Sequence, residues 1–343
     1  MPAEWEPHSG TWLTWPHNRE TWAPPDLGEV ENLFLDMIRI LAEGEWVHLL
    51  VNDDASRERV LQKFKNEKIP ADRVQLHLIP TNDAWIRDYG PNFIIRSGVR
   101  ENPIAINQWG FDSWGKKYEW ELDANAGTEI ALRLEFQRFQ PGIVLEGGAI
   151  EVNGRGTCLT TASCLLNPNR NGGLTREIME DYLKDYLGVQ KIIWLNGGIE
   201  GDDTDGHIDN LARFIAPNTI LCAYEEDPAD KNHEILKKNY QALCNATDPH
   251  GNRFEVIRLP MPGKVQGHSG RLPASYANFY IGNRTVLLPV FGHANDQRAL
   301  ALLQESFPER DVAVLPCRKL LIGLGGIHCV TQQQPLAPAR EHG

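Results

Sequence analysis

The segment 315–334, LPCRKLLIGLGGIHCVTQQQ, contains the residues around which the rest of the chain is organised. Its run 319–322 is predicted to be a short strand that leads into the glycine turn GLGG at 323–326. Glycine lets the backbone approach another group closely. Cys329 follows this turn directly, so we expect it at the end of a strand, facing a site. A lone cysteine in such a turn is more often structural, and its interpretation as a nucleophile depends on the segments that precede it.

The composition is that of a globular protein, with 41% hydrophobic and 23% charged residues in a chain of 343. No apolar run approaches the ~20 residues that a membrane helix needs, and the N-terminus lacks the basic start and apolar core of a signal peptide. The six cysteines form no CxxC pair, which favours free thiols in a reducing cytoplasm over disulfides or a zinc cluster. We therefore expect a cytoplasmic protein. No Pro-, Gly- and Ser-rich linker divides the chain, which predicts a single domain over 1–343.

The net charge of −12 excludes some classes of partner. Nucleic acid and anionic membranes are poor partners for such a surface, whereas a small cationic ligand suits it. Composition alone leaves solubility as the simpler explanation of the acidity. The composition does not determine whether the protein forms a homo-oligomer.

Helices followed by strands recur along the chain, which indicates an α/β fold. The predicted pairs are helix 32–43 with strand 46–51, 56–66 with 74–79, 128–134 with 143–145, 175–187 with 192–195, 233–246 with 254–259, and 297–306 with 312–315. A polar or glycine-rich turn follows most of these strands. The long polar and aromatic segment 108–127 is predicted to be a loop that forms a lid, a pocket wall or a surface excursion.

Reactive residue types fall at the same place in successive units. Asp88, Glu146, His207, Asn278 and Cys329 all lie in these turns, and the gaps between them are 58, 61, 71 and 51 residues. A unit of roughly 60 residues therefore recurs five times. Ordinary α/β alternation explains the helices and strands but not this placement, whereas repeated units bring their functional loops to one face.

The segment GDDTDGHIDN at 201–210 combines acidic residues with a histidine. On a strand, His207 and Asp209 would face the same side. A calcium loop of the EF-hand type is excluded, because its first and last ligand positions would be Gly201 and Ala212. With no HxxxH or HxxE helix in the sequence, a zinc or iron site is not expected.

The combination of residue types is more specific than any one of them. Asp88 or Glu146 alone would be an ordinary turn residue beside glycine. A cysteine with a histidine supports covalent catalysis, because imidazole favours the thiolate and can later activate water. An excess of carboxylates around such a pair suits a guanidinium, which is planar, cationic and binds carboxylates in a bidentate manner.

At these residues the sequence resembles the agmatine deiminase and Porphyromonas-type peptidyl-arginine deiminase family, one of the guanidino-group modifying enzymes. The matching motifs are NDAWIRDYGP (82–91), LEGGAIEVNGRGTCLTT (145–161), LNPNRN (166–171), GDDTDGHIDN (201–210) and GGIHCVTQQQP (325–335). The resemblance covers nearly the whole chain. It implies a five-bladed α/β propeller, the pentein fold, and hydrolysis of a guanidinium to a urea and ammonia without metal or organic cofactor. Tyr89 departs from the family, in which many relatives carry Thr at this position.

The resemblance also implies residue roles. Asp88 and Asp209 would hold the guanidinium, and Cys329 would attack its central carbon. His207 would protonate the departing ammonia and then activate water. Glu146 would orient His207 or touch the substrate.

The remaining predicted contacts concern the rest of the substrate. Trp85 would wall the alkyl chain or stack on the guanidinium, although a core tryptophan is the plainer interpretation, and Gly326 would leave room for the substrate. Asp202 and Asp203, with their acidic neighbours, would bind a terminal amine. This favours agmatine, with N-carbamoylputrescine as product. A peptidyl-arginine substrate, an inactive polyamine-binding protein and a metallohydrolase remain as alternatives.

Overall fold

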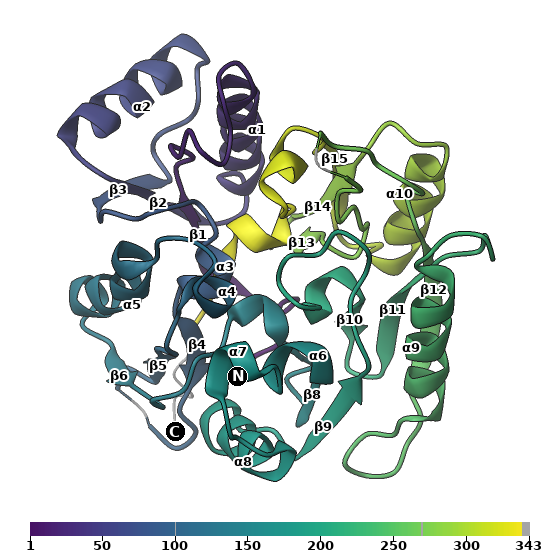
Figure 1. Cartoon of the computed structure of the whole chain (residues 1–343). Coiled ribbons are helices and arrows are strands. Elements are labelled where there is room, and N and C mark those ends of the chain that lie inside the picture. Colours follow the sequence, from purple (N-terminus) through teal and green to yellow (C-terminus); the bar gives the residue numbers. More distant parts are fainter. Residues whose placement is uncertain (100, 269, 338–343) are drawn as a thin grey trace.

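The computed structural model describes residues 1–99, 101–268 and 270–337. Five small sheets surround a common centre, and the longer helices lie on the outside (Figure 1). The strands of the five sheets, in spatial order, are β16 (Gln332–Pro335), β1 (His8–Thr14), β2 (Trp46–Val51) and β3 (Val74–Leu78); β4 (Asn92–Ile95), β5 (Ile104–Asn107) and β6 (Gln137–Phe139); β7 (Glu151–Val152), β8 (Thr157–Thr161) and β9 (Lys191–Leu195); β10 (Ala212–Ala216), β11 (Thr219–Tyr224) and β12 (Glu255–Pro260); and β13 (Tyr280–Ile281), β14 (Thr285–Val290) and β15 (Asp311–Pro316).

Each sheet has the same design. Its first two strands are antiparallel and its next pair is parallel, as in β10, β11 and β12. Parallel neighbours need a crossover connection, and helices supply it in every sheet. These helices are α1 (Asp26–Leu41), α2 (Asp54–Asn66), α4 (Ser113–Lys116), α5 (Glu121–Leu134), α6 (Ala162–Leu165), α7 (Pro168–Asn171), α8 (Arg176–Leu187), α9 (His233–Asn245) and α10 (Asn295–Ser306).

The first sheet joins the two ends of the chain. The C-terminal strand β16 pairs antiparallel with β1, with Trp12 opposite Gln332. The ring of sheets is closed by this pairing rather than by a continuous stretch of chain. Segments near both termini therefore lie beside the centre of the molecule.

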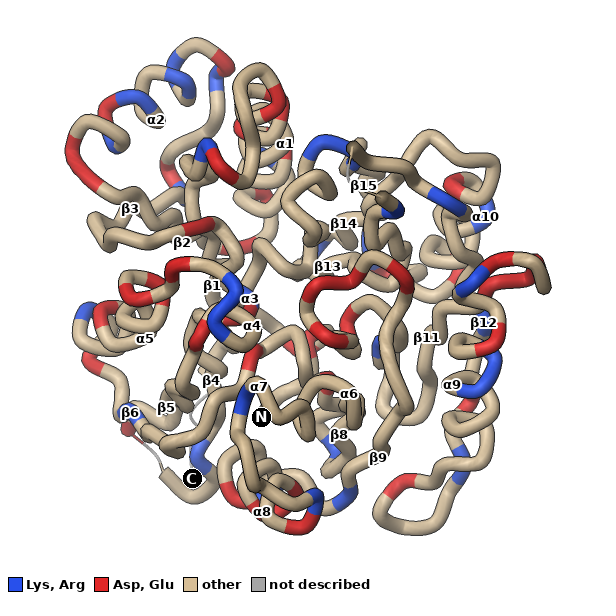
Figure 2. The backbone as a smooth tube through the Cα atoms, in the orientation of Figure 1, with Lys and Arg blue, Asp and Glu red and all other residues tan. Residues whose placement is uncertain are grey.

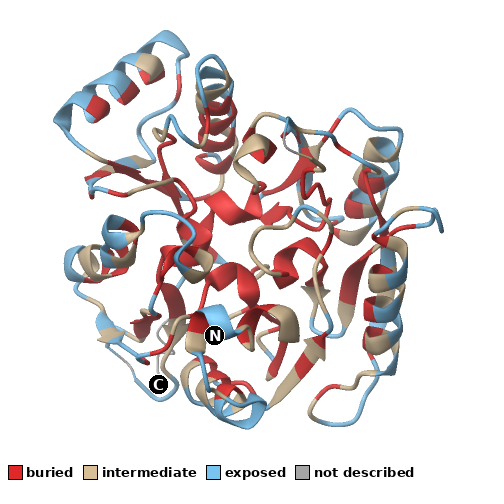
Figure 3. Ribbon diagram, in the orientation of Figure 1, coloured by how far each residue is buried: buried red, intermediate tan, exposed pale blue. Residues whose placement is uncertain are grey.

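The core lies between each sheet and its helix and continues into the centre (Figure 3). In α1 the side chains at helical spacing, among them Leu33, Phe34, Met37 and Ile38, are buried as the sequence pattern predicts. Among the described residues, no helix is both long enough and apolar enough to cross a membrane.

The five-bladed α/β propeller implied by the resemblance is confirmed, and each predicted 60-residue unit corresponds to one sheet with its helices. The prediction of a strand at 143–145 is wrong. The third strand of that sheet is β6, and residue 144 makes only an isolated bridge to Gly110. Ile143 and Leu145 form an apolar run because both are buried beside the centre.

Two further strand predictions are wrong. Residues 320–322 lie in the 3-10 helix η3 (Leu320–Gly323), upstream of the turn that carries Cys329, and residues 208 and 209 lie in the 3-10 helix η2 (Ile208–Asn210), directly before β10. A single tight turn changes the chain direction so that the next residues can enter the sheet. The segment 108–127 is likewise not a continuous loop, because it contains α4 and the start of α5.

Candidate active site

The five residues that mark the repeats all lie at the centre of the propeller, shortly before the first strand of a sheet. Asp88 is in the short helix α3 (Ile86–Tyr89), and Glu146 precedes the 3-10 helix η1 (Gly147–Ala149). His207 precedes η2, Asn278 precedes β13, and Cys329 is in the 3-10 helix η4 (His328–Val330). The common position of these turns in the repeated unit explains why residues 51–71 positions apart meet in one site.

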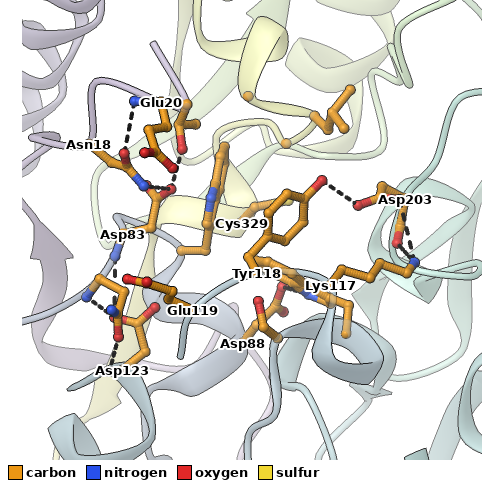
Figure 4. A pocket seen from close by; sticks show the side chains of 18 of the residues that line it. Asn18, Glu20, Asp83, Asp88, Lys117, Tyr118, Glu119, Asp123, Asp203 and Cys329 are labelled. Atoms are coloured by element: carbon orange, nitrogen blue, oxygen red, sulfur yellow. Dashed lines mark hydrogen bonds and ion pairs between the residues drawn. The ribbon is translucent and has the colours of Figure 1, made fainter. Parts of the chain in front are cut away.

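A cavity of about 870 Å³ opens beside this centre. Asp88 and Cys329 lie on its wall, and Tyr118 and Lys117 lie opposite Asp203 (Figure 4). Carboxylates predominate among its charged side chains, namely Glu20, Asp83, Asp88, Glu119, Asp123 and Asp203, against Arg19 and Lys117. The acidic loop 200–205 approaches the centre from the neighbouring sheet (Figure 2). A cationic ligand therefore suits this cavity.

Cys329 is held at the inner end of the cavity, 5% exposed. Its Sγ lies 3.3 Å from Nδ2 of Asn278 and 3.8 Å from Oδ2 of Asp209. Burial, together with the negative charges of Asp209 and Asp88, raises the pKa of the Cys329 thiol well above its usual value. The sulfur therefore rests as a thiol, and a cation that neutralises the carboxylates would favour the thiolate.

His207 is fully buried between two carboxylates. Its Nδ1 lies 3.6 Å from Oδ1 of Asp88, and its Nε2 lies 3.9 Å from Oε2 of Glu146. Burial lowers the pKa of His207, but Asp88, Cys164 and Glu146 raise it further, so that the pKa lies well above the usual value. The ring is thus a proton donor at neutral pH. Within the described part of the chain, neither ring nitrogen has a hydrogen-bond partner; Nδ1 faces the space beside Gly148, and Nε2 faces Glu146.

The carboxylates differ in protonation because their surroundings differ. Burial, opposed by His207, raises the pKa of Asp88 to about 6. Burial alone would raise the pKa of Asp209, but the His328 ring lowers it overall. For Glu146, contact with His207 and the charge of Arg170 outweigh burial and lower the pKa. Arg170 Nε donates to Oε1 of Glu146 at 2.8 Å, and both side chains are completely buried.

Gly148 marks the point where these groups converge. Its backbone N–H donates to Oδ1 of Asp88 at 3.0 Å. A Cβ atom at this position would lie 2.6 Å from Nδ1 of His207, 2.7 Å from Oδ1 of Asp88 and 3.1 Å from Oδ2 of Asp209. The predicted Asp–His–Asp set therefore lies around one small space, and the second glycine of the LEGG motif keeps that space open.

The residues predicted to bind the rest of the substrate have different positions. Trp85 lines the cavity and packs against Trp22, with ring centroids 5.2 Å apart. Asp203 also lines the cavity, where its carboxylate accepts hydrogen bonds from Lys117 Nζ at 3.4 Å and from the Tyr118 hydroxyl at 2.9 Å. Its carboxylate thus already holds an ammonium group supplied by the protein itself.

Asp202 and Gly326 are not on the wall of the cavity, and neither are Glu146, His207 and Asp209, which lie behind Asp88 and Cys329. Asp202 instead accepts hydrogen bonds from the backbone and hydroxyl of Thr204. A Cβ on Gly326 would lie 2.4 Å from Oδ1 of Asn278. Gly326 therefore makes room for Asn278, which in turn contacts the sulfur of Cys329.

One group of described residues has the donor types of a metal site. Ligand atoms of Glu146, Cys164 and His207 lie within 4.8 Å of one another. The group does not suit a resident metal, because Arg170 already neutralises Glu146 and burial raises the pKa of the Cys164 thiol.

Several residues of the site were not predicted. Asn278 was used only as a marker of its repeat, although its position in the unit is that of the other site residues. Trp114 donates to Asp88, and it lies in a segment whose composition indicated a loop without a role for any one residue. Arg170 lies in the LNPNRN motif and His328 adjoins the cysteine, so both positions were visible in the sequence, but their partners were not.

Comparison with known proteins identifies the family of this chain. The Porphyromonas-type peptidyl-arginine deiminase family matches residues 1–335. Agmatine deiminase of Medicago truncatula is 37% identical over 98% of this chain and 96% of that protein. The structure of Enterococcus faecalis agmatine deiminase has a TM-score of 0.88 at 32% identity, covering 98% of this chain and 95% of that one. A cysteine-to-serine variant of C. jejuni agmatine deiminase with substrate bound gives 0.88 at 31% identity, covering 98% and 96%. The chain therefore belongs to the Porphyromonas-type peptidyl-arginine deiminase family.

Proposed function

We propose that this protein hydrolyses agmatine to N-carbamoylputrescine and ammonia. The observation that carries the proposal is the convergence of Asp88, His207 and Asp209 on the space beside Gly148, with the sulfur of Cys329 3.8 Å from Asp209. Two carboxylates and a protonated imidazole around a thiol fit a planar cation that must lose one nitrogen. Full-length relatives named agmatine deiminase support the choice of substrate.

Binding starts with the two aspartates. Asp88 and Asp209 would receive N–H groups of the guanidinium, in the manner in which carboxylates bind arginine side chains. The positive charge of the substrate offsets the charges that keep the Cys329 thiol protonated. The thiolate then attacks the central carbon of the guanidinium, and a C–S bond forms.

His207 moves the protons of both halves of the reaction. It donates its proton to a nitrogen of the tetrahedral adduct, and the C–N bond breaks. Ammonia departs, and an S-alkylated thiouronium remains on Cys329. The neutral ring next accepts a proton from water, whose oxygen attacks the same carbon. Collapse of that adduct breaks the C–S bond while the hydroxyl proton passes to the departing sulfur, which releases the urea and returns Cys329 as a thiol. Acid–base catalysis of this kind typically contributes about 10²–10⁴ in rate.

Glu146 and Arg170 support His207 in this scheme. The pKa of Glu146 is held low, so its carboxylate stays ionised near Nε2 of the ring and favours the imidazolium. Arg170 fixes the other oxygen of Glu146. Glu146 therefore acts on the proton carried by His207 rather than on the substrate.

The wall of the cavity favours an amine at the far end of the substrate. Glu20 and Glu119 face the cavity, while Asp203 is occupied by Lys117. A terminal ammonium is attracted to such a wall, and a carboxylate, as in free arginine, is repelled. Peptidyl-arginine, which has neither charge next to its alkyl chain, is the second candidate, and the name of the matching family favours testing it.

The test is a panel of agmatine, arginine and an arginyl peptide, read out as ammonia release. We expect much the highest kcat/KM with agmatine. A preference for the peptide would overturn the choice of substrate, and agmatine binding without product would indicate an inactive polyamine-binding protein. Activity that survives Cys329→Ser but is lost with a chelator would instead indicate a metallohydrolase.

We also propose that the chain forms a single catalytic domain that acts in the cytoplasm. All six cysteines are free, and four of those other than Cys329 are buried, which suits a reducing compartment. Light scattering of the purified protein tests whether it is a homo-oligomer, and limited proteolysis tests whether the chain behaves as one domain.

A further inference from the structure

The N-terminal segment places Glu4 at the centre of the propeller, 5% exposed. Its carboxylate accepts hydrogen bonds from Nη2 of Arg213 at 2.6 Å and from the backbone N–H of Ile281 at 2.9 Å. It also lies 2.8 Å from Nε2 of His328 and 3.3 Å from Nη2 of Arg87. One carboxylate from the start of the chain therefore joins residues of four separate sheet units.

Two of these partners adjoin residues of the active site in the chain. Arg87 directly precedes Asp88, and His328 directly precedes Cys329. Arg87 Nε also donates to the backbone oxygen of His328 at 3.3 Å. Glu4 thus holds together the two turns that carry a substrate carboxylate and the nucleophile, without reaching the cavity itself.

His328 continues this connection into the site. The ring is 1% exposed, and its Nδ1 lies 2.8 Å from Oδ2 of Asp209 while its Nε2 faces Glu4. A neutral imidazole has one N–H and can donate to only one of these oxygens. Both contacts are satisfied when both nitrogens carry protons, which gives two charge-assisted hydrogen bonds.

The consequence appears at Asp209. Its Oδ2 is fixed by His328, whereas its Oδ1 is buried and has no hydrogen-bond partner within the described residues. A buried carboxylate oxygen without a partner is costly unless a ligand completes it. The orientation of the Asp209 carboxylate therefore depends on His328, and the position of His328 depends on Glu4.

We infer that Glu4 and His328 are positioning residues of this active site: Glu4 holds the His328 ring, and His328 holds Oδ2 of Asp209, the oxygen that faces the space beside Gly148 where the guanidinium would bind. This inference deepens the proposed function and rests on it. The competing view is that the two residues only join the sheets, as a buried ion-pair network can do.

Two substitutions of His328 separate these views. In His328→Asn the amide can take the place of Nδ1 and keep a donor on Asp209, but it cannot reach Glu4. In His328→Gln the amide can take the place of Nε2 and keep a donor on Glu4, but it leaves Asp209 without one. Both side chains are neutral, and their difference is only which neighbour they retain.

If His328 positions Asp209, His328→Gln should lose more kcat/KM than His328→Asn, chiefly because its KM for agmatine rises. A loss of about 10²-fold in kcat/KM is the scale for a misplaced binding group, and His328→Asn should lose markedly less. A purely structural role predicts the opposite order or equal values, with KM unchanged and only the folded fraction reduced. Circular dichroism and thermal melting report that fraction for each variant.

Glu4 has a matched control in Glu151, which is also 5% exposed and also binds Arg213, at 3.0 Å. Glu4→Gln and Glu151→Gln both weaken the contacts of Arg213, but only Glu4→Gln changes the carboxylate in direct contact with His328. We expect KM for agmatine to rise in Glu4→Gln and to stay near the wild-type value in Glu151→Gln. Equal KM values in the two variants would overturn the inference even if the His328 variants failed to fold.

Calorimetry separates this inference from the proposed function. Agmatine binding is measured in a Cys329→Ser background that also carries His328→Asn, His328→Gln or neither change. Weaker binding with Gln than with Asn supports positioning even if the wild-type enzyme released no ammonia. Equal binding of the two double variants contradicts it, whatever the turnover of the wild type.

Discussion

The indole Nε1 of Trp114 donates a hydrogen bond of 2.9 Å to Oδ2 of Asp88. Trp114 belongs to a stretch, 113–116, in which all four residues have positive φ, including 55° at Ser113 and 64° at Lys116. Such a conformation is unfavourable for residues other than glycine. Asp112 stabilises the turn by accepting from the N–H of Gly115 at 3.0 Å. A strained turn is therefore held directly against a carboxylate of the active site.

The first prediction concerns the pH dependence that Trp114 imposes on Asp88. The pKa of Asp88 is raised to about 6, chiefly by burial, and the Trp114 hydrogen bond lowers it. Because the ionised form binds the guanidinium, kcat/KM should fall as the pH falls through about 6. Trp114→Phe removes the donor but keeps an aromatic ring, so the midpoint should move to higher pH.

Ammonia release from agmatine between pH 5 and 9 measures this midpoint. Trp85→Phe is the matched control, because Trp85 also lines the cavity but makes no hydrogen bond to Asp88. An unchanged midpoint in Trp114→Phe would show that another group controls the acidic limb.

The second prediction is that the resting Cys329 reacts slowly with alkylating reagents. The pKa of its thiol lies well above the usual value because of burial and the charges of Asp209 and Asp88. The thiolate fraction, and with it the rate of reaction with iodoacetamide, should increase about tenfold per pH unit up to pH 9. Mass spectrometry of the modified peptide follows the rate, and a plateau near neutral pH would contradict the assignment.

Asp88→Asn provides the internal comparison for this experiment. Removing one of the two negative charges beside the sulfur should lower the pKa of Cys329 and accelerate alkylation at pH 7. The alkylation rate of Cys244, which is partly exposed on α9, is measured in the same sample as a control for the activity of the reagent.

The sequence predicted the repeated unit and the main site residues for a physical reason. In each repeat the functional residue precedes the first strand, so the similar spacing of Asp88, Glu146, His207, Asn278 and Cys329, with gaps of 51–71 residues, was enough to bring them together. Helices such as α1 were predictable because an amphipathic helix contains its periodicity in one segment of the sequence. The 3-10 turns at η2 and η3 were missed because three or four residues contain too little periodicity to distinguish a turn from a strand.

The contacts between residues far apart in the chain could not be predicted from the sequence. Glu4 meets His328 across 324 residues, and Trp114 meets Asp88 through a turn with unusual backbone angles. Neither pair has a local pattern, because each depends on closure of the ring or on strain that the rest of the fold maintains. For the same reason Gly326 was assigned to the substrate, whereas it makes room for Asn278.

The third prediction uses Gly148 as a steric probe of the site. An added methyl group would meet His207 and Asp88 at 2.6 and 2.7 Å, which is closer than a real Cβ contact allows. Gly148→Ala should therefore displace these groups and reduce kcat/KM by about 10²-fold or more. The backbone there does not require positive φ, so the fold should persist.

Gly28→Ala is the matched control for that substitution. Gly28 is in α1, and an added Cβ would meet no atom within 4 Å. Alanine is favoured over glycine in a helix by about 0.8–1 kcal/mol, so this variant should melt at a higher temperature with normal turnover. If Gly148→Ala also kept normal turnover, the space beside Gly148 would not be the site of reaction.

The fourth prediction contrasts the ion pairs of two cations, Lys117 and Arg170, that both reach the acidic loop 200–205. Arg170 does so through Asp205 and the backbone oxygen of Thr204. Lys117 pairs with Asp203, and the two side chains are 28% and 33% exposed. Arg170 pairs with Glu146 and both are fully buried. An exposed pair typically contributes about 0–1 kcal/mol, whereas breaking a buried pair by removing one partner typically costs about 3–5 kcal/mol.

We therefore expect Lys117→Met to unfold at nearly the wild-type urea concentration and Arg170→Met to unfold at a much lower one. Catalysis should separate the two further. Without Arg170, the pKa of Glu146 rises and the support for a protonated His207 weakens, so kcat should fall in the folded fraction of Arg170→Met. Lys117→Met should alter mainly KM, because it releases Asp203 to interact with the amine of the substrate. Comparable loss of kcat in both variants would mean that the acidic loop, rather than the Glu146–His207 contact, is what Arg170 supports.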